Sequence, residues 1–131
     1  MTNLLIEIAA YLQAELIVSG YGIDTFVDYE PDDPSSIVVI NEYAGLPSQT
    51  GIESARRSIQ ILTRDASSEI ARAKAWQIYN FLDTPDDRIH HLNAERVCIL
   101  AARQAPFKMR VDKTNRPVWG FNMGVTTIND K

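Results

Sequence analysis

The chain has 131 residues, of which 45% are hydrophobic and 23% are charged, and its formal net charge is −4. This is the length of one domain with an ordinary soluble composition, and an acidic balance is atypical of a general DNA-binding protein. The single cysteine excludes an internal disulfide, and we see neither a signal peptide nor an apolar run of about 20 residues that could cross a bilayer. We therefore expect one domain over residues 1–131 that is soluble and intracellular where it is made.

The first predicted element is an amphipathic helix. Apolar residues recur at spacings of three and four from Leu4 to Leu16. Thr2 is suited to cap its beginning, and Gly20 and Gly22 are expected to end it.

Three strands are predicted next. Residues 25–29 form a short aromatic and β-branched strand, and a turn follows at 31–36. Residues 37–43 are apolar on both faces, as in an inner strand. Residues 54–64 alternate clearly between apolar and polar side chains. Residues 44–51, which connect the second and third strands, are predicted to form an exposed loop and are a candidate docking segment.

A second helix is predicted over residues 67–82. Either Asp65 or Ser67 is suited to cap it, and it must end before Pro85. Alanine and larger apolar residues form one stripe along it, which predicts a face buried against the sheet.

The last third is predicted to be strand-rich. Residues 84–95 are polar and irregular, residues 97–102 form a buried strand, and residues 108–128 form a hairpin with its turn at 112–116. The predicted order is α-β-β-β-α-β-β-β. This order favours an α+β domain with a mixed, largely antiparallel sheet and two helices packed on one face.

Charge is sorted along the sequence. Residues 1–55 carry nine acids and no Lys or Arg, a formal charge of −9, whereas residues 56–131 carry thirteen bases and eight acids, +5. A domain with one acidic and one basic surface can associate head to tail into rings or filaments. Alternatively, the two halves interleave in the fold and the charges mix.

The first alternative gives a set of candidate interface residues. Those on the basic hairpin would meet a neighbouring subunit or phosphates, or would simply protect a sheet edge from aggregation. The candidates are Asp28, Glu30, Asp32 and Asp33 on the acidic side, and Arg56, Arg57, Lys108, Arg110 and Arg116 on the basic side.

The acidic turn imitates the start of a calcium-binding loop. Asp28, Glu30 and Asp32 are spaced two apart. The sixth position, however, is Asp33 rather than Gly, and the twelfth is Val39 rather than a bidentate Glu. We interpret the turn as solvated.

No catalytic or metal-binding set is predicted. The adjacent His90 and His91 cannot converge on one ion and are expected to be exposed loop residues. Cys98 lies in an apolar strand and is expected to be a buried structural thiol. Asp86 and Asp87 read as solvated, and the chain has no phosphate-binding, metalloprotease or serine-hydrolase motif. We predict no enzymatic activity, no metal and no cofactor.

Two stretches are similar to a known family. The first is Ser58–Asp65, ending in Arg64-Asp65 and leading into the alanine-rich helix; the second is the closing hairpin, from Pro106-Phe107 through Arg116–Trp119 to Phe121-Asn122. Over roughly residues 37–128 the chain resembles the tail-terminator, or minor capsid (neck), proteins of long-tailed bacteriophages and prophages. Arg64-Asp65 before the helix is the most telling feature.

The resemblance implies a structural virion protein of the tail and neck that is assembled in the host cytoplasm. It implies a hexameric ring that caps the tail tube, docks the head connector and lets DNA pass, and we hypothesise that acids line the ring's lumen so that DNA is repelled. The expected partners are further copies of the chain, the tail-tube protein and the head-completion protein. The alternatives are another head–tail neck protein, a tail-tube subunit, or a small hydrolase or ligand-binding domain.

Overall fold

The computed structural model describes residues 4–43, 55–83, 89–93 and 96–127. These residues form two helices and seven strands, in the order α1 (Leu4–Ala14), β1 (Thr25–Val27), β2 (Ile37–Tyr43), β3 (Ala55–Arg64), α2 (Ser68–Leu82), β4 (Ile89–His91), β5 (Val97–Ala102), β6 (Phe107–Val111) and β7 (Pro117–Thr127).

All seven strands join one sheet; six follow the order β1-β2-β3-β7-β5-β4, and β6 pairs with β7 beside this path. β7 is central, because it pairs with β3 along one side and with β5 and β6 end to end along the other. Only β1 and β2 run parallel, and the other pairs are antiparallel. The predicted α+β class with a mixed, largely antiparallel sheet is confirmed.

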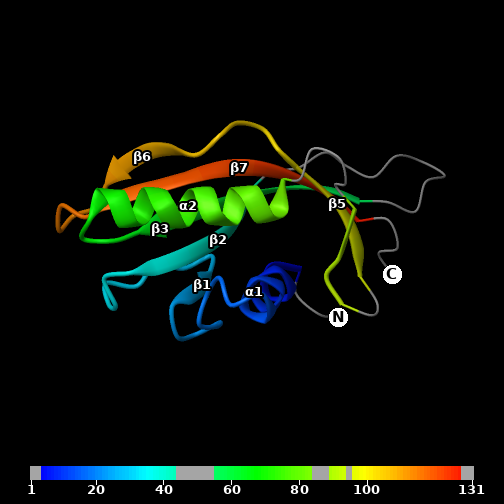
Figure 1. Cartoon of the computed structure of the whole chain (residues 1–131), viewed down its shortest axis with the longest axis horizontal. Coiled ribbons are helices and arrows are strands. Elements are labelled where there is room, and N and C mark those ends of the chain that lie inside the picture. Colours follow the sequence, from blue (N-terminus) through cyan, green and yellow to red (C-terminus); the bar gives the residue numbers. More distant parts are fainter. Residues whose placement is uncertain (1–3, 44–54, 84–88, 94–95, 128–131) are drawn as a thin grey trace.

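Both helices pack on the same face of this sheet. Alternation along β3 places Ile59 and Ile61 on the face that contacts α1 and α2, and all of these elements contribute to one buried cluster. Figure 1 shows α2 lying along β3 and β7, with α1 beside β1 and β2. A smaller apolar cluster on the opposite face centres on Val39, Leu62 and Val118, with Phe26 and Met109 packed against it.

α2 begins as the sequence predicts. Ser67 is the N-cap, and its hydroxyl accepts the backbone N–H of Ile70 at 3.4 Å. Ala71 and Ala75 are fully buried toward the sheet. Their small side chains allow the helix to lie close to β3 and β7.

α1 ends earlier than predicted. It stops at Ala14, and the N–H groups of Leu16 and Ile17 donate to the carbonyls of Gln13 and Leu12. This is a Schellman termination with Leu16 at the left-handed position, φ 60°. The chain therefore turns before Gly20, so Leu16 is exposed and Ile17 is buried in its place.

Residues 89–91, in the stretch predicted to be irregular, also differ from the prediction. Ile89–His91 form the edge strand β4, paired antiparallel with β5. Three residues are too few for a recognisable alternation, so this strand is defined by its partner rather than by its own sequence. The first strand is also shorter than predicted, because Asp28 has a positive φ of 54°.

Three predicted features lie outside the described residues, namely the Thr2 cap, the 44–51 loop and Asp86-Asp87. Within the part of the chain that the structure describes, neither helix is long and apolar enough to span a membrane.

Candidate assembly surfaces

The acidic turn and the basic hairpin meet within one chain. The Arg110 guanidinium lies 2.7 Å from the Glu30 carboxylate, and the Lys113 ammonium lies 3.2 Å from the Asp32 carboxylate. Arg116 Nη1 donates to the Asp32 carbonyl at 2.7 Å. At this corner the two oppositely charged halves of the sequence interleave, as the second alternative anticipated.

Arg64 holds the turn at residues 31–36 in place. It is 3% exposed, and its Nη2 donates to the carbonyls of Asp32 and Pro34 at 3.2 and 2.8 Å, while Nε donates to that of Ser35 at 3.3 Å. Burial lowers the pKa of Arg64, the nearby Arg116 lowers it further, and the surrounding carboxylates oppose both effects. Because one planar guanidinium donates to three backbone carbonyls, the Arg64 side chain is held in one position.

Asp112 joins Arg64 to the hairpin. Its carboxylate accepts the backbone N–H groups of Arg116 and Thr114 at 2.8 and 3.0 Å, and Arg116 Nε at 2.9 Å. Arg64 Nε lies 3.7 Å away. Burial raises the pKa of Asp112, but the hydrogen bonds from Arg116 and Thr114 outweigh it and lower the pKa to about 2.

Two further candidate residues have partners on their own chain. Arg57 forms a bidentate ion pair with Glu42 across β2 and β3, at 2.5 and 2.6 Å. Asp28 accepts the backbone N–H of Glu42 at 3.0 Å, which stabilises the left-handed turn after β1.

The remaining candidates are Asp33, Lys108 and Arg56. Asp33 and Lys108 are exposed, and Arg56 pairs with Thr126 in the β3–β7 ladder. An intersubunit role for any of the nine candidates stays a prediction.

Asp65 fixes the junction between β3 and α2. Its carboxylate accepts the Ser36 hydroxyl and, at 2.9 Å, the backbone N–H of Ser67. Arg64 and Asp65 therefore attach the turn before β2 to the end of β3 and to the beginning of α2. The role of Arg64 and Asp65 here is structural.

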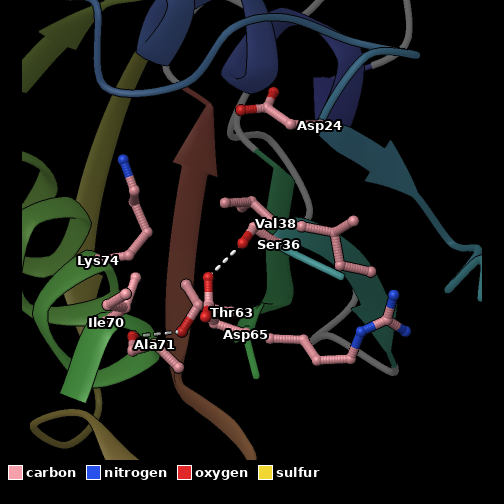
Figure 2. Close-up of a pocket in the computed structure, with 10 residues that line it drawn as sticks. Asp24, Ser36, Val38, Thr63, Asp65, Ile70, Ala71 and Lys74 are labelled. Carbon is pink, nitrogen blue, oxygen red and sulfur yellow. Dashed lines mark hydrogen bonds between the residues drawn. The ribbon is translucent and has the colours of Figure 1, made fainter. Parts of the chain in front are cut away.

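A pocket of about 220 Å³ opens beside this junction (Figure 2). Thr63 donates to the Ala71 carbonyl at 2.7 Å, and Lys74 donates to the Ile17 carbonyl at 2.6 Å. The Asp24 carboxylate accepts the backbone N–H groups of Ser19 and Gly20 at 3.0 Å. As Figure 2 shows, Asp65 is turned toward Ser36, so the polar lining is engaged in holding the fold.

The histidine prediction is wrong for one residue. His90 is buried in β4, and its Nδ1 forms a hydrogen bond of 2.9 Å with the Tyr11 hydroxyl, whereas His91 is exposed. Strand alternation separates them, because successive side chains point to opposite faces. Cys98, directly opposite His90, is buried as predicted.

Neither His90 nor Cys98 lines the pocket of Figure 2. Among the described residues, no group of three or more His, Cys, Asp or Glu is placed to hold a metal ion.

Sequence reasoning missed several exposed apolar residues. Leu16 and Ile23 precede β1, and Ile89 and Ile99 lie on β4 and β5; all four have large exposed fractions. Periodicity assigns such residues to the core, so the sequence contains no signal that separates them from buried ones.

The chain also matches a known protein family. The family model for the bacteriophage tail terminator protein matches residues 11–127, nearly the whole chain. The chain belongs to the bacteriophage tail terminator family. The match confirms the resemblance to this family and identifies a structural component of the virion tail. No curated protein matches the chain.

Proposed function

We propose that this protein closes into a ring on the end of a phage tail tube, stops its growth and provides the docking surface for the head connector. The observation that carries the proposal is the family match over residues 11–127. We expect six copies in the ring and DNA as passing cargo only. The acid-lined lumen remains part of the proposal.

The structure supports a role in assembly in two ways. The Arg64–Asp112–Arg116 network and the paired sheet give a rigid block, which suits a subunit that must keep its shape in a ring. The polar groups around the described pocket are bonded to their own chain, so the pocket offers no converging set for chemistry.

The test is to mix the purified protein with purified tail tubes and to image them by negative stain. A terminator adds a cap at one end of each tube and leaves tube length unchanged. A tail-tube subunit, the main alternative, would polymerise by itself or lengthen the tubes. A neck protein of another kind would bind only after a terminator is present. Bare tubes would contradict the terminator and tail-tube roles, and tubes that stay bare even when they carry a terminator would contradict the neck role as well.

A further inference from the structure

We draw no further inference here: the strongest candidate, the surface patch of exposed apolar side chains at Leu16, Tyr21 and Ile23 just before β1, carries no proposal because nothing in the structure shows what covers it.

Discussion

Leu16 combines two unfavourable features at one position. It has a left-handed backbone, φ 60°, where glycine is usual, and its side chain is 89% exposed. A leucine in this conformation costs about 1–2 kcal/mol. The two hydrogen bonds of the Schellman turn and the burial of Ile17 offset this cost.

Leu16→Asn should therefore stabilise the isolated protein by about 1 kcal/mol, because asparagine adopts the left-handed conformation more readily. Urea unfolding measures this effect. Ala14→Gly, two residues earlier in the last turn of α1, is the matched control and should lose about 1 kcal/mol. A destabilised Leu16→Asn would contradict the strain argument.

Asp112 is the second residue with a specific prediction. Asp112→Asn should lower the free energy of unfolding at pH 7 by about 3 kcal/mol, because it leaves two guanidinium groups without their shared carboxylate. The exposed pair Lys113–Asp32 provides the control, and Lys113→Gln should change stability by less than about 0.5 kcal/mol. Equal losses in the two variants would refute a special role for the buried carboxylate.

The same carboxylate predicts a pH dependence. Its pKa in the folded protein, about 2, is lower than its ordinary value of 3.8. The stabilisation is therefore fully present above about pH 4 and is lost as the pH falls through 2. Unfolding curves of the wild type should converge toward those of Asp112→Asn over this interval. A constant difference between them down to pH 2 would show that Asp112 does not titrate as described.

At the scale of elements, the β3–β7 pairing is the most constrained part of the fold. Gly120 lies opposite Leu62, and a Cβ atom added there would overlap the backbone carbonyl oxygen of Ile61. Gly124 lies on the same strand, but a Cβ atom added there would meet Arg103 at an ordinary 3.6 Å.

Gly120→Ala should thus destabilise the protein by about 1–3 kcal/mol, since the ladder must shift to accept the methyl group. Gly124→Ala should change the free energy of unfolding by less than about 1 kcal/mol. Thermal unfolding of both variants tests the difference. Similar melting temperatures would show that β3 and β7 do not approach as closely as the register requires.

Elements with a strong local signal could be predicted from the sequence. Residues 37–43 and 97–102 became β2 and β5 with the predicted bounds, and Ser67 caps α2. The errors occur where a contact distant in sequence decides the structure. β4 exists because β5 lies beside it, and α1 ends early because Ile17, rather than Leu16, reaches the core.

At the scale of the whole molecule, charge sorted along the sequence is not charge sorted in space. The acids before residue 34 and the bases after residue 109 meet at one corner, because Arg64 holds the turn there and Asp112 connects Arg64 to the hairpin. Sequence alone left both arrangements open, since sorting along the chain does not specify which strands become neighbours.

The most direct test of the account is cryo-electron microscopy of tail tubes saturated with the protein. We predict a closed ring of identical copies at one end of each tube. Tube ends without an ordered ring, or a protein that continues the tube as a helix, would contradict it.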